Sequence, residues 1–296
     1  LTTSLAKVYK VSMPQNASAA ALKALTDWWE EMGVAVDQAE IAAVMKAQQS
    51  SPIPAQAGNS DAQRPDSAAQ DSRLRGNERG SRRRNQNKTL TDWIAEAGAL
   101  AASADSLESL KTAIEGFEGC PLKQLCEKTV VYDGTLGAPV MVLGEGPGGQ
   151  EDRIGLPFVG KAGQLLDKML AAIGLDRKTN TFISNVNYWR PPGNRNPEVD
   201  ELAVCRPFVN RMVDLAQPKI IIATGGVATK SLLDTKTGIM RLRGSERPFE
   251  TPAGTNVPLV PMFHPAYLLR RPQDKSRAWR DLLLVQARLK EMGVEV

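Results

Sequence analysis

The chain has 296 residues, of which 42% are hydrophobic and 24% are charged, and its formal net charge is +4. It is long enough to bury at least one full core, and no run approaches the roughly 18 to 20 apolar residues that a membrane helix needs. Three cysteines argue against a disulfide framework, and residues 1–13 lack the apolar core of a signal peptide, so we expect a cytoplasmic protein.

The N-terminal part of the chain divides into two segments. Residues 1–47 are predicted to form an N-terminal helical segment, in which 19–33 carry an amphipathic pattern that ends at Gly33. From 48 to 88, Ser, Pro, Gly, Asn, Gln and Arg replace almost all large apolar residues. Such a segment cannot offset its ordering entropy by burial, which predicts a disordered basic linker.

Residues 89–296 have the regular pattern of one domain. Short apolar runs typical of strands occur at 129–133, 139–144, 181–186, 219–225 and 258–263. Amphipathic stretches typical of helices occur at 162–175, 197–216, 226–234 and 274–293. Strands that alternate with helices predict an α/β domain whose parallel sheet has helices on both faces.

The residues after the 139–144 run match the spacing G-x-G-x-x-G. In a dinucleotide-binding loop a helix opens at once, and an acidic residue about 20 positions on ends a second strand. Here Pro147, Gly155 and Pro157 argue against a regular helix, and Asp167 falls inside a helical pattern. We therefore predict a long, irregular, glycine-rich loop without a dinucleotide.

Polar residues follow the ends of three predicted strands. Glu145 begins the glycine-rich loop, which also carries Phe158; Asn185 closes the 181–186 run; and His264, the only histidine, follows 258–263. Ligands of open α/β sheets bind outside the carboxyl ends of the strands. These four side chains are therefore expected to converge on one crevice.

Three longer blocks carry a family resemblance: GEGPGGQEDRIGLPFVGKAGQLLDKML (144–170), NVNYWRPPGNRNPEVDELAVCRPF (185–208) and HPAYLLRRP (264–272). They resemble the signature blocks of the family 4 uracil-DNA glycosylases, in order, over about 117–289. The resemblance implies a three-layer α/β/α sandwich around a short, mostly parallel sheet. It also implies a DNA repair enzyme that flips uracil out of DNA and hydrolyses its N-glycosidic bond, leaving an abasic site and free uracil.

The resemblance assigns catalytic roles to three residues. Asn185 would read the O4 and N3–H edge of uracil, His264 would donate to O2 as negative charge develops, and Glu145 would orient water or stabilise the cationic sugar. Phe158 would stack on the flipped ring. Three more positions match the uracil pocket: Gly146, Glu151 and Asn194.

The segment after His264 is expected to handle DNA. Leu268 and Leu269 would fill the gap left by the flipped base, and Arg270 and Arg271 would meet flanking phosphates. The alternative is an amphipathic helix start with solvated arginines. Three further arginines would extend the basic surface: Arg190, Arg195 and Arg206.

The cysteine set departs from the family pattern, in which four cysteines hold a [4Fe–4S] cluster. Cys120 and Cys205 remain, but Lys123 and Trp189 stand at the other two positions, and Cys126 does not restore the spacing. The usual cluster needs four thiolates. We therefore predict no cofactor and no metal, with a [4Fe–4S] cluster as the alternative, and we expect the Trp189 indole to fill the vacated volume.

The sequence thus predicts a uracil-DNA glycosylase that acts on single- or double-stranded DNA as a monomer, in the cytoplasm and on the nucleoid. The rival interpretation is a binding protein that recognises uracil or abasic DNA with little or no turnover. Retention of Glu145, Asn185 and His264 favours the enzyme, because a pure binder does not need all three.

Overall fold

The computed structural model describes residues 88–296; the predicted segments 1–47 and 48–88 lie outside that range, apart from Lys88. One sheet has the strand order β1-β3-β2-β4-β6-β5. The strands are β1 Tyr132–Gly134, β2 Val140–Gly144, β3 Thr181–Asn185, β4 Ile220–Thr224, β5 Arg247–Glu250 and β6 Asn256–Met262. The four central strands pair in parallel, and β1 and β5 add antiparallel edges. This confirms the predicted, mostly parallel sheet.

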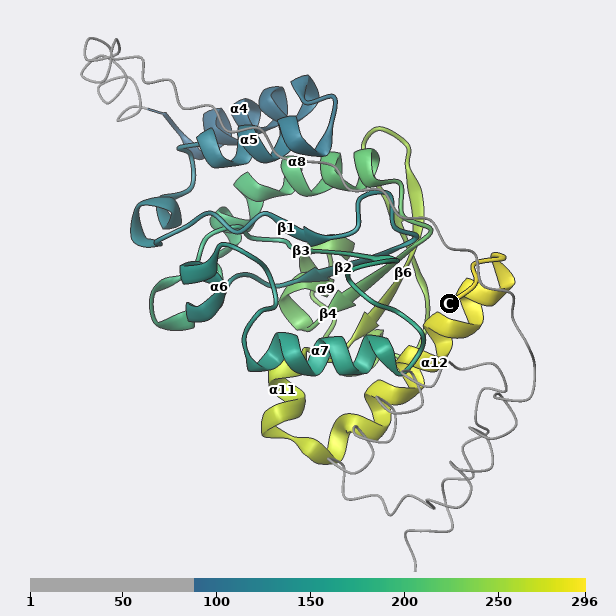
Figure 1. Ribbon diagram of the computed structural model, residues 1–296. Helices are drawn as coiled ribbons and strands as arrows, with labels where there is room; N and C mark the ends of the chain where they lie inside the picture. Colours follow the sequence, from purple (N-terminus) through teal and green to yellow (C-terminus); the bar gives the residue numbers. More distant parts are fainter. Residues whose placement is uncertain (1–87) are drawn as a thin grey trace, which may run out of the picture.

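Helices cover both faces of the sheet. The α-helices are α4 Leu90–Ser103, α5 Leu107–Gly116, α6 Gly149–Ile154, α7 Lys161–Ala171, α8 Val199–Ala216, α9 Gly226–Leu233, α10 Ile239–Leu242, α11 Pro265–Arg270 and α12 Lys275–Glu291. Short 3-10 helices are η1 Pro121–Leu125, η2 Pro192–Asn194 and η3 Pro272–Asp274. In Figure 1, α4, α5 and α8 lie on one side of the sheet and α7, α11 and α12 on the other, which gives three layers. No helix within residues 88–296 has the length and apolar character of a membrane span.

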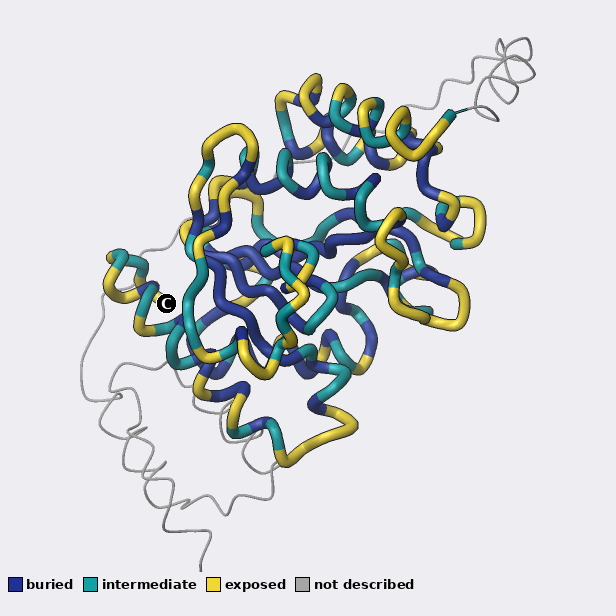
Figure 2. Tube along the Cα trace, turned by 180° about the vertical axis from the view of Figure 1, so that it is seen from behind, coloured by how far each residue is buried: buried dark blue, intermediate teal, exposed yellow. Residues whose placement is uncertain are grey.

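Alternation along the central strands explains the two cores. All five residues of β2 are buried (Figure 2). Met141 and Leu143 join the core beneath α4, α5 and α8, whereas Val140 and Val142 join the core beneath α7 and α12. Since successive side chains of a strand point to opposite faces, an unbroken apolar run marks a strand covered on both sides.

The glycine-rich loop differs from the prediction, because a short helix, α6, forms inside it. Pro147 precedes the N-cap Gly148, so its missing N–H interrupts no helical hydrogen bond. Gly155, with a φ of 89°, ends the helix after six residues. The prediction was therefore wrong at 149–154, and the loop is irregular only before and after this helix, at 145–148 and 155–160.

Two edge strands also differ from the sequence pattern. The 129–133 run contributes only its end to β1, which pairs antiparallel with β3. Strand β5 was not predicted, because Phe249 is its only buried residue and so no apolar run marks it.

Candidate active site

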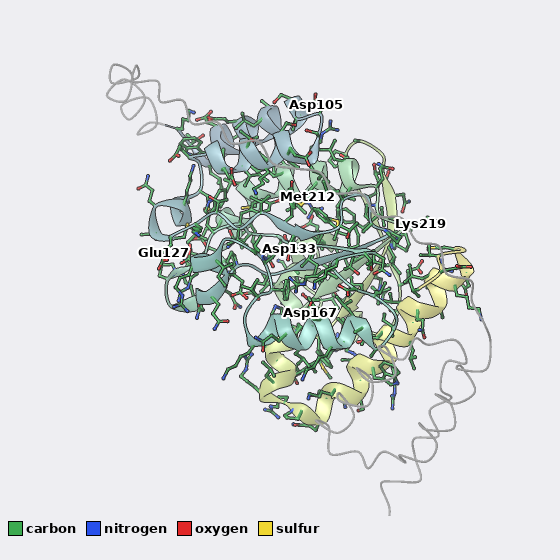
Figure 3. All side chains as sticks on the ribbon, in the orientation of Figure 1. Asp105, Glu127, Asp133, Asp167, Met212 and Lys219 are labelled. Carbon is green, nitrogen blue, oxygen red and sulfur yellow. The ribbon has the colours of Figure 1, made fainter. Side chains whose placement is uncertain are left out.

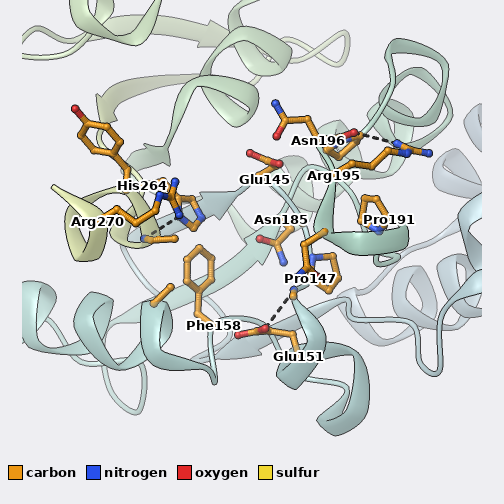
Figure 4. A pocket seen from close by; sticks show the side chains of 17 residues that line it. Glu145, Pro147, Glu151, Phe158, Asn185, Pro191, Arg195, Asn196, His264 and Arg270 are labelled. Atoms are coloured by element: carbon orange, nitrogen blue, oxygen red, sulfur yellow. Dashed lines mark hydrogen bonds between the residues drawn. The ribbon is translucent and has the colours of Figure 1, made fainter.

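A pocket of about 390 Å³ opens at the carboxyl ends of the parallel strands. Glu145 follows β2 directly, Asn185 is the last residue of β3, and His264 lies two residues after β6. Figure 4 shows these side chains and the Phe158 ring directed toward the same space. The expected convergence at this edge of the sheet is confirmed.

The pocket wall contains every residue that was predicted to act in catalysis or to bind uracil: Glu145, Gly146, Glu151, Phe158, Asn185, Asn194 and His264. Arg270 also lines it. Sequence reasoning missed Ala162, Asn196 and Tyr267, which lie in the wall as well. Tyr267 follows His264 by three residues on α11, and this helical spacing was the available signal.

Asn185 offers an unused amide to the pocket. Its side chain is buried, and within the described residues its Nδ2 has no hydrogen-bond partner. Gly144, which pairs with Asn185 across β2 and β3, makes this position possible. A Cβ at Gly144 would lie 2.4 Å from the Asn185 Oδ1 and 2.5 Å from the Phe158 Cζ. Since a buried amide without a partner is costly, the geometry indicates that a ligand takes the bond.

His264 is held as a neutral proton donor. Its Nδ1 accepts a hydrogen bond from the Ala266 N–H at 3.1 Å, which leaves the ring proton on Nε2. Burial, reinforced by the charge of Arg270, lowers the pKa of His264 to about 4. The ring stacks on Phe158, with centroids 5.7 Å apart and planes inclined by 27°. Nε2–H is therefore available at neutral pH.

Glu145 is the carboxylate of the pocket. Burial raises its pKa above the ordinary value. Across residues 88–296 its oxygens have neither a hydrogen-bond nor an ion-pair partner. An unpaired, partly buried carboxylate can accept a proton from water or stabilise positive charge on a ligand.

Glu151 is occupied by backbone groups. Its Oε2 accepts from the Gly148 N–H at 3.2 Å, and its Oε1 accepts from the N–H groups of Val159 at 3.0 Å and Gly160 at 2.8 Å. It therefore shapes the pocket wall by joining α6 to the segment that carries Phe158.

Asn194 is also engaged within the protein. Its backbone is left-handed, with a φ of 56°, and its Oδ1 accepts from the Arg190 Nε at 2.8 Å. Arg190 in turn lies 3.6 Å from the buried carboxylate of Asp152. These contacts hold Asn194 in place in the pocket wall.

The structure corrects two of the predicted DNA contacts. Leu268 is 0% exposed and packs in the core beneath α7 and α12, so it cannot enter DNA; on a helix, only its neighbour Leu269, 45% exposed, faces outward. Arg206 is engaged within the protein, where its half-buried guanidinium donates to the carbonyl groups of Ser231 and Leu232. Arg271, by contrast, is exposed.

The cysteine positions do not form a four-thiolate site. The Lys123 ammonium donates to the carboxylate of Glu118 and to the Glu115 carbonyl, each at 2.6 Å, and so points away from the core. Burial raises the pKa of Cys205 well above its usual range, and its hydrogen bond to Cys120 lowers the pKa of Cys120. Among the described residues, no group of three or more cysteine, histidine or acidic side chains is arranged to hold a metal. The residues present do not fit a [4Fe–4S] cluster.

An aromatic cluster fills the space beside these two cysteines; we define it as Trp93, Phe117, Tyr188, Trp189 and Phe208. Trp189 is fully buried, with ring centroids 6.3 Å from Phe117 and 5.8 Å from Tyr188. Its Nε1 donates to the Thr129 Oγ1 at 3.0 Å. Cys120 and Cys205 belong to the same core. The indole thus packs where the family pattern has a cysteine ligand.

Comparison with known proteins identifies what the chain resembles. Residues 131–283 match the uracil DNA glycosylase superfamily. The chain is 36% identical over 172 residues to a type-4 uracil-DNA glycosylase of Thermotoga maritima, covering 58% of this chain and 87% of that protein. A type-4 uracil-DNA glycosylase of Sulfurisphaera tokodaii is 38% identical over 173 residues, 57% of this chain and 78% of its own length. One of Pyrobaculum aerophilum is 34% identical over 184 residues, 60% and 92% respectively.

Proposed function

Because the chain belongs to the uracil DNA glycosylase superfamily, we propose that this pocket receives a uracil flipped out of DNA. The protein is a uracil-DNA glycosylase, a hydrolase of base excision repair. The pocket residues would break the N-glycosidic bond and leave an abasic site and free uracil. The observation that carries this assignment is the convergence of three polar groups that are available to bind a ligand: the Asn185 amide, the His264 Nε2–H and the Glu145 carboxylate.

Asn185 would select the base. Its Nδ2 donates to O4 of uracil while its Oδ1 accepts the N3–H, a pattern that cytosine reverses. The unpartnered Nδ2 supports this role, because the amide is already desolvated and held in place before the base arrives. Phe158, which lines the pocket, would stack on the uracil ring from one side.

His264 and Glu145 would act on the bond itself. The transition state separates charge, with a cationic sugar and a base that leaves as an anion. The Nε2–H of His264 would donate to O2 of the departing uracil. Glu145 would orient the attacking water or stabilise the sugar cation, and its lack of a partner keeps it free to do so.

The DNA strand would be held next to the pocket. Leu269 is an exposed apolar side chain that can fill the gap left by the base; Arg270, which lines the pocket, and the exposed Arg271 follow it. Phosphate contacts of this kind release counterions, so DNA binding should weaken steeply as salt rises. A flat salt dependence would contradict this surface.

We further propose that the protein works without an iron–sulfur cluster. Only Cys120 and Cys205 keep the family positions, and the Trp189 ring takes part of the space. The reaction above uses no redox chemistry, so the aromatic cluster is expected to serve as the local support of the fold. The enzyme would act as a monomer in the cytoplasm, on single- or double-stranded DNA.

One experiment tests the function directly. A labelled oligonucleotide with one uracil is incubated with excess protein, and alkali reveals abasic sites; Asn185→Ala and His264→Ala are assayed in parallel. We expect cleavage by the native chain and a loss of about a hundredfold or more in each variant. Full rates in both variants would contradict the assigned residues. Tight retention of uracil or abasic DNA without cleavage would instead support a binding protein.

A further inference from the structure

Phe158 has a backbone conformation that its own chemistry does not favour. Its φ is 53°, in the left-handed region that a bulky side chain rarely adopts. Such a conformation persists only when the surrounding structure enforces it. Since Phe158 faces the pocket, the residues that enforce it also place the ring.

The peptide bond that follows Phe158 is held from both ends by opposite charges. On one end, the Phe158 carbonyl accepts from the Arg177 Nη2 at 2.9 Å, and the Pro157 carbonyl lies 3.3 Å from Nη1. On the other end, Glu151 accepts from the N–H groups of Val159 and Gly160. Charge-assisted bonds on both sides fix the orientation of this peptide plane.

Arg177 is itself fixed by two carboxylates. Its Nη1 lies 2.8 Å from the Asp133 Oδ2, and its Nη2 lies 2.7 Å from the Asp167 Oδ1. Asp133 belongs to β1 and Asp167 to α7, and Figure 3 labels both. The guanidinium therefore joins the sheet and a helix to the segment that carries the aromatic ring. Lysine could not reproduce this geometry, since its three N–H donors lie on one nitrogen and cannot span two carboxylates and two carbonyl groups.

Gly163 lies directly against the backbone of Phe158. A Cβ on this residue of α7 would lie 1.8 Å from the Phe158 carbonyl oxygen and 2.1 Å from its carbon. The backbone of Phe158 thus lies directly against the helix, at a distance that only glycine permits.

We propose that Arg177, which lies outside the pocket wall, is a positioning residue for uracil excision that sets the conformation of Phe158. The inference rests on the proposed function and names the residue that orients its stacking ring. Loss of the guanidinium would release the Phe158 carbonyl, and the ring would no longer be held against the base.

The test is a double-mutant cycle with Arg177→Gln and Phe158→Ala. Single-turnover cleavage should fall about tenfold in Arg177→Gln, because a stacked base loses its platform. In the Phe158→Ala background the same change should have almost no further effect. Arg177→Lys should give an intermediate rate.

The matched control is Arg211→Gln. The Arg211 guanidinium also donates to a backbone carbonyl, that of Ala104, and neither residue lines the pocket. This variant should leave the rate unchanged. Additive losses, or a full rate in Arg177→Gln, would overturn the proposal.

Amide hydrogen exchange gives a readout that does not depend on cleavage. The N–H groups of Val159 and Gly160 should exchange faster in Arg177→Gln than in the native chain or in Arg211→Gln. Unchanged exchange would overturn the positioning role. If the native chain does not cleave uracil, the proposed function fails, and this exchange comparison still decides whether Arg177 holds the segment.

Discussion

The pocket and the aromatic cluster solve opposite problems within one domain. In the pocket, the buried Asn185 Nδ2 and the partly buried Glu145 carboxylate have no partners within residues 88–296. In the aromatic cluster, the Trp189 ring is fully buried and its Nε1 donates to Thr129. Buried polar groups without hydrogen-bond partners lower the stability of a fold, whereas packed aromatic rings raise it.

The difference teaches which part of the family pattern is chemical and which is structural. In the pocket, each residue of the family pattern named above is present, because uracil can be bound and its glycosidic bond broken only by specific donors and acceptors. At the place where the family pattern has four cysteines for an iron–sulfur cluster, two of the four are replaced here, yet the volume is still filled by side chains. Support for a fold can be exchanged for other packing of similar size, but a set of reacting groups cannot.

The largest effect is expected from Glu145→Gln. It removes the ionisable carboxylate and should lower single-turnover cleavage by roughly 10²- to 10⁴-fold. The free energy of unfolding should stay the same or rise, because the lost charge had no partner. Denaturant titration and the cleavage assay measure both. Glu118→Gln, which alters an ion pair with Lys123 at the surface, is the control and should leave cleavage intact. A destabilised Glu145→Gln variant would remove the contrast between the two regions.

Trp189→Ala should show the reverse behaviour. Emptying the volume of a buried indole should cost about 3–5 kcal/mol in the free energy of unfolding. Cleavage, measured where the variant remains folded, should be close to the native rate, because the indole does not line the pocket. Trp189→Phe keeps a ring and should lose much less stability. If Trp189→Ala abolished cleavage while folded, the aromatic cluster would have a role in the reaction.

The pH profile should show one acid limb. Glu145 must be ionised, and burial raises its pKa, so the cleavage rate should fall as the pH drops toward and below the ordinary glutamate range. His264, with a pKa of about 4, stays mostly neutral down to pH 4.5, the lower limit of the profile, and adds no step near pH 6.5. Rates measured from pH 4.5 to 9 test this, and Glu145→Gln should flatten the profile. A titration step near pH 6.5 that disappears in His264→Ala would contradict the neutral histidine.

The smallest effect is expected from replacing both Cys120 and Cys205 by alanine. Neither sulfur lies in the pocket wall, so cleavage should stay within about twofold of the native rate. Iron content and visible absorbance of the purified native chain are measured alongside. A coloured, iron-containing protein that loses colour and activity in the double variant would establish a cluster and overturn the packing interpretation.

Much of the site could be predicted from the sequence, because it is built from strand ends. Buried runs such as 139–144 mark the parallel strands, and parallel strands necessarily bring their carboxyl ends together. That rule, with the resemblance of the three blocks, was enough to collect Glu145, Asn185 and His264 in one pocket.

Side-chain direction and local backbone conformation were decided by tertiary structure alone. Leu268 and Leu269 are adjacent residues of the same type, and only the packing of α11 determines which of them is buried. The helix at 149–154 was excluded on the strength of Pro147, Gly155 and Pro157, but Glu151 within it accepts hydrogen bonds from Val159 and Gly160 and so joins it to the segment that follows.

The support for Phe158 was equally out of reach of the sequence. Asp133 lies 44 residues before Arg177 in the sequence, and Glu151 lies 26 residues before it. No local pattern joins the three residues. Periodicity reports which residues are buried, since burial follows from repeating geometry along one element. A left-handed aromatic held between a guanidinium and a carboxylate depends on contacts between elements, and only the folded chain supplies these.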